Sequence, residues 1–423
     1  MTSYSVITFG CRVNQADSLE LERALMARGA TSAPPEQSDV VIVNSCTVTA
    51  AADQGVRQTV RRLARSNPHA KIVVTGCYAT RRPDDLCALP NVVRVVSNDE
   101  KERLVQLLYD EERALTTSER YGDGGDACGS GWVPGTGGRT AMTLRVQTGC
   151  GERCSYCIIP KTRGVSRSRP LDQVLSDVGH AIAAGYKEVI ITGVHLGSYG
   201  RDLAPATTLT SLAGHLANVS GDVVFRISSL EPMDCPPELV DLVASSPRLA
   251  PHFHLPLQHG SDAMLSAMRR PYTVAHFARL VESIHARMPD ASIGTDLIVG
   301  FPGETAAHFD ETRRLLEHLP LSHLHVFPYS DRPGTEASAM GDKVDGAAIR
   351  ARGQVLREIG HGMARRFGRA QVGRTIRGLT VDDGWSAVTP NYLKLKLDRQ
   401  RPRNEWVTLR IETAEPLSAR VES

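Results

Sequence analysis

The sequence lacks three features that would narrow the class of protein at once. It contains no apolar run of the roughly 18–20 residues that a membrane-spanning helix needs, so we expect no membrane segment. Residues 1–5 carry no basic side chain and precede no long apolar stretch, so we expect no secretory signal and a cytoplasmic location. Charge of one sign is not in excess either, because 49 Lys and Arg against 47 Asp and Glu give a net charge of +2. Any surface for nucleic acid must therefore be a local patch.

Cysteine, by contrast, is frequent, with nine residues in a chain of 423. A reducing compartment disfavours disulfides, and the number is odd. Metal ligation or redox chemistry is therefore the better explanation, and the spacing of the cysteines decides between these possibilities.

The first hundred residues alternate short apolar runs with helical patterns. Residues 6–9, 40–43 and 72–75 are predicted to be strands. Asp17 and Glu20 resemble the start of a helix between the first two strands. Since strands that alternate with helices favour a parallel sheet, we predict an α/β domain over residues 1–112.

A change in composition separates this region from the next. Residues 121–138 are rich in glycine and have too few apolar groups to pack, so a linker is predicted over residues 113–139. The alternation then resumes with six candidate strands, which are Leu144–Gln147, Val189–Thr192, Val223–Ile227, His252–Leu257, Ser292–Val299 and Leu321–Phe327. Six such units fit a partial (β/α)6 barrel over residues 140–366.

The end of the chain changes character again. After Asp345 the pattern predicts a long basic helix. Residues 367–423 contain short alternating runs separated by turn residues, which predict a small β-barrel. The predicted fold class is therefore α/β, with a partial barrel between an α/β domain and a small β-barrel.

The most informative motif directly follows the first barrel strand. Cys150, Cys154 and Cys157 form a C-x3-C-x2-C triplet. Three thiolates can hold three irons of a [4Fe–4S] cubane and leave the fourth iron open to the amino and carboxylate groups of a methionine moiety. The alternative is a structural zinc site, but zinc prefers four ligands, typically in two close pairs.

This triplet resembles that of the radical S-adenosylmethionine superfamily. The resemblance implies a partial (β/α)6 barrel, a [4Fe–4S] cluster at the C-terminal ends of its strands, and S-adenosylmethionine as cofactor. It covers the whole of the predicted barrel, and it gives Cys150, Cys154 and Cys157 a catalytic role.

Three further cysteines follow the three predicted strands of the first domain. These are Cys11, Cys46 and Cys77. Because the C-terminal ends of parallel strands share one edge, we expect the three thiols to converge on a second metal site. The alternative is three buried structural cysteines, since a free cysteine often behaves as a small apolar side chain.

The segments around these cysteines resemble the methylthiotransferase family. They are Thr8-Phe9-Gly10-Cys11-Arg12-Val13-Asn14, Asn44-Ser45-Cys46-Thr47-Val48-Thr49 and Gly76-Cys77. The resemblance implies that Cys11, Cys46 and Cys77 hold an auxiliary [4Fe–4S] cluster whose open iron serves the transferred sulfur. It also implies that the terminal barrel is an RNA-binding TRAM domain. Cys87, Cys128 and Cys235 fall outside both trios and are predicted not to be ligands.

Polar and glycine-rich segments at the barrel strand ends are candidates for cofactor contacts, as is usual for barrel enzymes. The predicted cofactor-binding residues are Thr192, Gly193, Ser228, Glu231, Gln258, Gly300 and Tyr329. His195 and His259 could be acid–base groups, but polar histidines at the rim are the better explanation. Residues 160–170 carry four cations, Lys161, Arg163, Arg167 and Arg169, which could contact phosphate unless the loop is merely solvated.

The terminal barrel combines basic and aromatic side chains, a mixture that suits RNA. They are Lys394, Lys396, Arg399, Arg401 and Arg403, with Trp385, Tyr392 and Trp406.

The family resemblance predicts a radical reaction that replaces C–H by C–S on a modified adenosine of tRNA, with a second S-adenosylmethionine supplying the methyl group. Cys46-Thr47-Val48-Thr49 and residues 163–170 look most like the branch that acts on N6-threonylcarbamoyladenosine beside the anticodon. Branches acting on isopentenyladenosine or on a ribosomal protein aspartate are the alternatives. An unidentified electron donor and a sulfur source are implied. A non-catalytic, metal-stabilised RNA-binding protein is the hypothesis from another class.

Overall fold

The computed structural model describes residues 3–115, 134–135 and 140–422. Most of the predicted linker 113–139, with Cys128, lies outside these ranges. The described part consists of a parallel sheet with helices, a larger strand–helix barrel and a closed β-barrel, in chain order. The α/β fold class and the three architectures are confirmed, whereas the exact domain limits stay predictions.

The N-terminal sheet has five strands in the order β2-β1-β3-β4-β5, and every neighbouring pair is parallel. The strands are β1 (Ser3–Thr8), β2 (Thr31–Ser32), β3 (Val40–Ser45), β4 (Lys71–Gly76) and β5 (Val92–Val96). β2 contains no apolar residue, and β5 has four valines interrupted by Arg94; neither was among the predicted strands.

Helices cover both faces of this sheet because the central strands are apolar on both sides. α1 (Arg12–Met26) and α5 (Leu104–Leu115) pack on one face, and α2 (Ala50–Ser66) and α4 (Pro83–Cys87) pack on the other. α1 begins at Arg12, so the prediction of a helix start at Asp17 and Glu20 is wrong. Asp17 lies inside α1 and is buried, and its role is described below.

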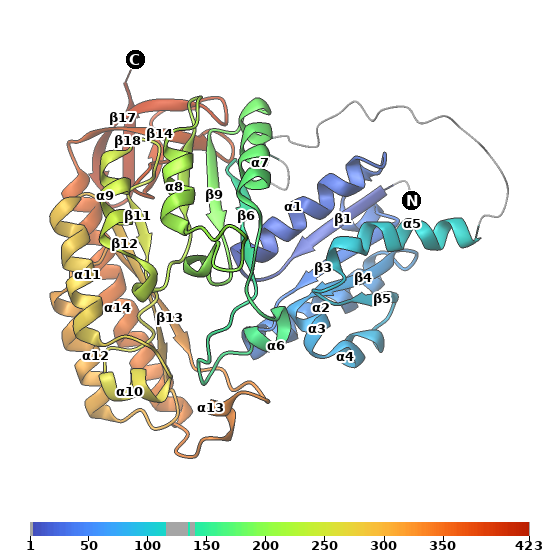
Figure 1. Cartoon of the computed structure of the whole chain (residues 1–423), viewed down its shortest axis with the longest axis horizontal. Helices are drawn as coiled ribbons and strands as arrows, with labels where there is room; N and C mark the ends of the chain where they lie inside the picture. Colours follow the sequence, from blue (N-terminus) through green and yellow to red (C-terminus); the bar gives the residue numbers. More distant parts are fainter. Residues whose placement is uncertain (1–2, 116–133, 136–139, 423) are drawn as a thin grey trace.

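The barrel has six parallel strands that do not close, as predicted. They are β6 (Met142–Arg145), β9 (Glu188–Thr192), β10 (Val224–Ile227), β11 (His252–His254), β12 (Ser292–Val299) and β13 (His323–Pro328). The strands form two three-stranded sheets. Two isolated bridges link them: Phe225 of β10 with Leu249, just before β11, and Ser229, just after β10, with His254 of β11. The order is therefore β6-β9-β10-β11-β12-β13, and the N-terminal domain lies beside the open side (Figure 1).

The outside of the barrel is covered by α7 (Leu171–Ala183), α8 (Leu209–Ala217), α9 (Pro237–Ser245), α11 (Val274–Arg287), α12 (Ala306–His318) and α14 (Gly346–Gln371). Their apolar faces and the strands form one continuous core. Shorter elements at the strand ends are α3 (Cys77–Arg81), α6 (Ile159–Arg163), α10 (Asp262–Ala267), α13 (Glu336–Ala339) and the pair β7 (Gln147–Thr148) and β8 (Arg167–Ser168). No described helix has the length and apolar content to cross a membrane.

The C-terminal barrel is closed by β14 (Thr375–Val381), β15 (Ser386–Val388), β16 (Lys394–Leu397), β17 (Trp406–Ala414) and β18 (Leu417–Val421). It contacts residues that precede the strands of the larger barrel. Arg377 Nη1 lies 3.0 Å from Asp222 Oδ1, and Asn404 donates to the carbonyl of Gly185 at 2.8 Å. The small barrel therefore sits at the end where the larger barrel's strands begin (red, Figure 1).

Candidate active site

The loop that carries the central cysteine triplet starts directly after β7. Gly149 begins it at φ +74°, and a Cβ there would clash with the carbonyl oxygen of Val165, so only glycine fits. The thiols of Cys150, Cys154 and Cys157 lie close enough in this loop for each charge to affect the others. Burial, followed by the nearby Cys154 and Cys150, raises the pKa of Cys157 to about 12. Three thiols thus gather where the barrel strands end, in the arrangement that the sequence predicts.

Two cationic groups face this trio. Arg270 Nη1 donates to Cys154 Sγ at 3.0 Å, and Glu231 forms an ion pair with the same guanidinium. His195 Nε2 lies 2.7 Å from Asp234 Oδ2. Burial favours neutral His195, but hydrogen bonds to Asp234 and Cys150 raise its pKa to about 10. Positive charge beside a thiolate stabilises it, so these groups form an outer layer for metal-binding sulfur.

His195 follows β9 and His259 follows β11, at the barrel edge where the sequence places them. Both side chains are buried, and His259 Nδ1 accepts a hydrogen bond from the backbone of Ser261 at 3.1 Å. Sequence alone did not show this because the Asp234 partner of His195 is 39 positions away.

The second trio lies at the C-terminal edge of the N-terminal sheet. Cys11 follows β1, Cys46 follows β3, and Cys77 opens α3 after β4. Gly10, at φ +92°, packs so closely on Cys46 that a Cβ would lie 2.7 Å from Cys46 Sγ. Burial raises the pKa of Cys46 to about 12, and Cys11 and Cys77 contribute in the same direction. The three thiols are therefore neighbours, as the strand-end argument expects.

The chemistry of both trios fits iron–sulfur clusters better than zinc. Structural zinc prefers four ligands, whereas each trio offers three thiols. Three soft thiolates suit a cubane, in which they ligate three of the four irons. Metal binding would also offset the burial that disfavours the free thiolates of Cys46 and Cys157.

The predicted cofactor residues lie at the same edge of the barrel as the triplet. Thr192 ends β9, and Ser228, just after β10, donates to Thr192 Oγ1 at 3.1 Å. A Cβ on Gly193 would lie 2.9 Å from Gln147 Oε1. Gln258 and Gly300 adopt positive φ after β11 and β12. Tyr329 follows β13, and among the described residues its hydroxyl has no partner although it is buried. Their contacts with S-adenosylmethionine stay predictions.

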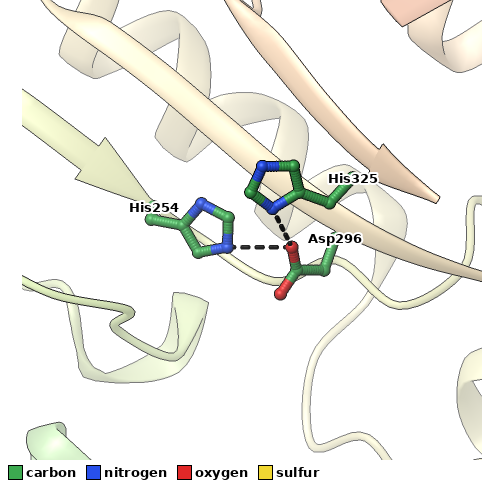
Figure 2. A group of neighbouring side chains, drawn as sticks. All are labelled: His254, Asp296 and His325. Carbon is green, nitrogen blue, oxygen red and sulfur yellow. Dashed lines mark hydrogen bonds and ion pairs between the residues drawn. The ribbon is translucent and has the colours of Figure 1, made fainter. Parts of the chain in front are cut away.

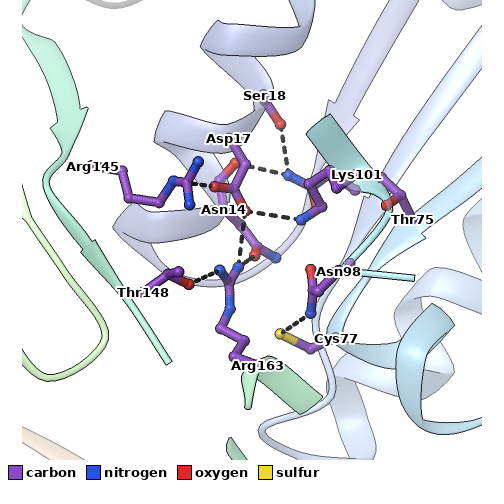
Figure 3. A network of polar contacts seen from close by, with 12 residues as sticks. Asn14, Asp17, Ser18, Thr75, Cys77, Asn98, Lys101, Arg145, Thr148 and Arg163 are labelled. Carbon is purple, nitrogen blue, oxygen red and sulfur yellow. Dashed lines mark hydrogen bonds and ion pairs between the residues drawn. The ribbon is translucent and has the colours of Figure 1, made fainter. Parts of the chain in front are cut away.

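A buried charge network joins the two domains, and the sequence did not reveal it (Figure 3). Asp17 Oδ2 lies 2.9 Å from Lys101 Nζ and 3.0 Å from Arg163 Nη2, and Asp17 Oδ1 lies 3.0 Å from Arg145 Nε. Burial opposes ionisation of Asp17, but the three cations together hold its pKa well below its usual range. Arg163 also donates to Asn14 Oδ1 at 2.5 Å.

This network fixes one cysteine trio relative to the other. Arg163 belongs to the segment after Cys157, whereas Asp17 belongs to the helix after Cys11. Asn98 completes the link, since its Nδ2 lies 3.6 Å from Cys77 Sγ and 2.9 Å from the carbonyl of Thr162.

The basic segment 160–170 contributes less free charge than predicted. Arg163 is 3 % exposed and is neutralised by Asp17, so the prediction that it contacts phosphate is wrong. Lys161 donates to the carbonyl of Gly334 at 2.5 Å, and Arg169 pairs with Asp177 at 2.5 Å. Arg167 remains exposed, with Asp99 at 3.3 Å.

The C-terminal barrel keeps part of the predicted RNA surface. Trp385 and Lys396 are exposed, and Lys396 lies on β16. Lys394, the other exposed lysine of β16, forms an ion pair with Asp382 at 2.6 Å. Tyr392 is also exposed, and it lies against the larger barrel, where its ring centroid is 4.6 Å from that of His252.

The inner face of the last barrel strands carries a group of histidines that the sequence did not single out (Figure 2). His254 Nε2 and His325 Nδ1 lie 2.9 and 3.2 Å from the same oxygen of Asp296. Burial opposes ionisation of Asp296, but these two hydrogen bonds lower its pKa to about 2. The Asp296 carboxylate thus satisfies both imidazoles and keeps His325 oriented.

Comparison with known proteins agrees with this geometry. Residues 3–98 match the "Uncharacterized protein family UPF0004", and residues 144–316 match the radical SAM superfamily. The chain is 35 % identical to threonylcarbamoyladenosine tRNA methylthiotransferase MtaB of Aquifex aeolicus, over 92 % of this chain and 95 % of that protein. It is 36 % identical to the Bacillus subtilis protein of the same name, over 82 % of this chain and 77 % of that protein. It is also 34 % identical to tRNA-2-methylthio-N(6)-dimethylallyladenosine synthase of a Parafrankia species, over 90 % and 78 %.

A solved structure supports the fold. The radical S-adenosylmethionine methyltransferase TsrM of Kitasatospora setae aligns with a TM-score of 0.57 and 16 % identity, over 80 % of this chain and 74 % of that chain. At this identity the likeness concerns the architecture alone. The cysteine trios, the partial barrel and the relatives of high coverage lead to one conclusion: the chain belongs to the tRNA methylthiotransferase family of radical S-adenosylmethionine enzymes.

Proposed function

We propose that this protein converts N6-threonylcarbamoyladenosine, next to the anticodon of tRNA, to its 2-methylthio derivative. The observation that carries the proposal is the presence of two cysteine trios at the C-terminal strand ends of two neighbouring domains, in a chain whose relatives, matched over most of their length, are named for this reaction. A tRNA substrate implies that the enzyme works in the cytoplasm. The reaction also needs an electron donor and a sulfur source.

In this proposal Cys150, Cys154 and Cys157 hold one [4Fe–4S] cluster, and Cys11, Cys46 and Cys77 hold the other. When bound, the clusters and S-adenosylmethionine supply radical chemistry able to cleave an unactivated C–H bond and a sulfur to replace the hydrogen. Arg270 and His195 stabilise the negative charge of the first trio's sulfur ligands. The Asp17 network and Asn98 keep the two trios at a fixed separation, so that a substrate base between them is oriented toward both.

The barrel strand ends supply the cofactor pocket in this proposal. Thr192, Gly193, Ser228, Gln258 and Gly300 line it, and the unpartnered Tyr329 hydroxyl is available as a donor. Glu231 acts through Arg270 because the two side chains form an ion pair.

The test is mass spectrometry of tRNA nucleosides from cells with and without the gene. Selective loss of 2-methylthio-N6-threonylcarbamoyladenosine, restored by the intact gene but not by Cys150→Ala, supports the proposal. An unchanged level of this nucleoside contradicts it.

A second candidate is the same reaction on isopentenyladenosine, favoured by the 34 % identity to the dimethylallyladenosine synthase. The same nucleoside analysis separates the two, since each predicts the loss of a different methylthio product. A non-catalytic RNA-binding role predicts no change in either nucleoside and bound zinc in place of iron.

A further inference from the structure

Arg12 connects the three structural units at the open side of the barrel. It is the first residue of α1 and directly follows Cys11. Its Nη2 donates to the hydroxyl of Tyr392, in the C-terminal barrel, at 2.8 Å. The Tyr392 ring in turn packs on His252 at the start of β11, with a centroid distance of 4.6 Å. The guanidinium therefore lies between the auxiliary cysteine trio and the inner face of the barrel.

The other terminal nitrogen of Arg12 is unsatisfied. Among the described residues, Arg12 Nη1 is buried and has no hydrogen-bond partner. A buried cationic donor without an acceptor is costly, so an acceptor from outside the chain is expected. Carboxylates of the barrel strands do not fill this role, because Glu188 pairs with Arg226 at 2.6 Å and Asp296 is held by the two imidazoles.

A second donor faces the same space. The His325 side chain is 56 % exposed, and its ring lies 5.3 Å from that of His254 (Figure 2). The His323 ring lies 5.4 Å from that of His325. Arg12 acts electrostatically on both His325 and His252. The inner face thus presents a guanidinium and an imidazole to the same region, an arrangement suited to a small anion.

We propose that Arg12, supported by His325, binds the carboxylate of the substrate's threonyl group and makes the enzyme selective for a charged N6 substituent. This inference rests on the proposed function. The threonylcarbamoyl group carries a carboxylate, whereas the dimethylallyl group is apolar. A site with an unpaired buried cation discriminates strongly against an uncharged analogue, because binding the analogue leaves the cation unpaired.

Two other roles for Arg12 make different predictions. If Arg12 only stabilised the contact with Tyr392, its loss would weaken the binding of all RNA ligands equally. If it served the metal site beside Cys11, its loss would lower the iron content. Neither role makes binding depend on the charge of the nucleoside.

The experiment measures binding of synthetic anticodon stem-loops to the full-length, iron-reconstituted protein by fluorescence anisotropy. Three stem-loops differ only in the modified adenosine, which is threonylcarbamoyladenosine, its carboxylate methyl ester or isopentenyladenosine. The proteins are wild type, Arg12→Gln, Arg12→Lys and Tyr392→Phe. The last is the matched control that removes the Arg12–Tyr392 hydrogen bond and keeps Arg12. Iron content and the thermal midpoint are recorded for each protein.

Wild type is expected to bind the acid about 10- to 100-fold more tightly than the ester, as for one charge-assisted contact. Arg12→Gln should bind both equally at unchanged iron content, Arg12→Lys should keep part of the preference, and Tyr392→Phe should keep the ratio. The inference is overturned if wild type binds acid and ester equally, if Arg12→Gln keeps the preference, or if it loses iron. The ester comparison uses unaltered protein, so a variant that fails to fold does not remove the test. Failure of wild type to thiolate a stem-loop that it binds by its carboxylate would contradict the proposed function alone.

Discussion

Arg332 Nη2 lies 2.6 Å from Asp53 Oδ2 and 2.7 Å from Thr47 Oγ1, so a residue beyond the last barrel strand is bound to the segment that follows Cys46. Both charged side chains are nearly buried, with exposures of 4 % and 10 %. The Asp17 network binds the N-terminal domain to the first barrel strand, β6. The Arg332–Asp53 pair binds it to the segment after the last strand, β13, so the domain is held on both sides of the barrel opening.

Arg332→Met should therefore destabilise the protein by about 3 kcal/mol, since removing one partner leaves a buried charge. We expect the low end of the usual range because Arg81 also lies 3.4 Å from Asp53. Urea unfolding measures the change. Arg314→Met, at an exposed pair within α12, is the matched control and should cost under about 1 kcal/mol. Equal effects of the two substitutions would contradict this role of Arg332.

Replacement of Asp17 should change how stability depends on pH. Its folded pKa lies well below the value of about 3.9 in an unfolded chain. Its contribution is therefore fully present above about pH 5 and is lost as the pH falls below about 4, because the unfolded chain takes up the proton first. Asp17→Asn should be less stable at neutral pH and lose less stability on acidification. Urea unfolding at several pH values checks this, with the exposed Asp84→Asn expected to follow wild type.

Each single substitution of a cluster cysteine should halve the iron content of the protein. Cys150→Ala and Cys11→Ala are each expected to bind about four irons per chain after anaerobic reconstitution, against about eight for wild type. Cys87→Ala removes an exposed cysteine outside both trios and should keep all eight. Colorimetric iron and sulfide assays give the counts. Retention of eight irons by Cys150→Ala, or bound zinc in wild type, would refute the two-cluster assignment.

Gly10→Ala should damage the auxiliary site selectively. The new methyl group would lie 2.6 Å from Cys46 Cβ, and the backbone at φ +92° is strained for any side chain. We expect the loss of about four irons with the barrel triplet intact. Gly29→Ala has a similar strain, at φ +79°, but meets no atom within 4 Å. It should lose stability without losing iron, and a matching iron loss there would show that strain alone is responsible.

The sequence was sufficient for features that depend on local pattern. The six cysteines follow strand ends, and both the apolar runs and the thiols are visible in short windows. The charge networks could not be found this way, because Asp17 is 84 positions from Lys101 and 146 from Arg163. Asp17 therefore looked like a helix cap, and Arg163 looked like a free phosphate contact. The short strand β2 has only two residues, Thr31 and Ser32, and neither is apolar.

The contact between the C-terminal barrel and the start of the large barrel's strands has a geometric consequence. β12 is eight residues long, so the two ends of the large barrel are separated by roughly 26 Å at about 3.3 Å per residue. α14, with 26 residues, spans this height rigidly before it enters the small barrel. The small barrel is thus held at the end where the strands of the large barrel begin, and Tyr392 is the point at which it reaches Arg12, next to Cys11.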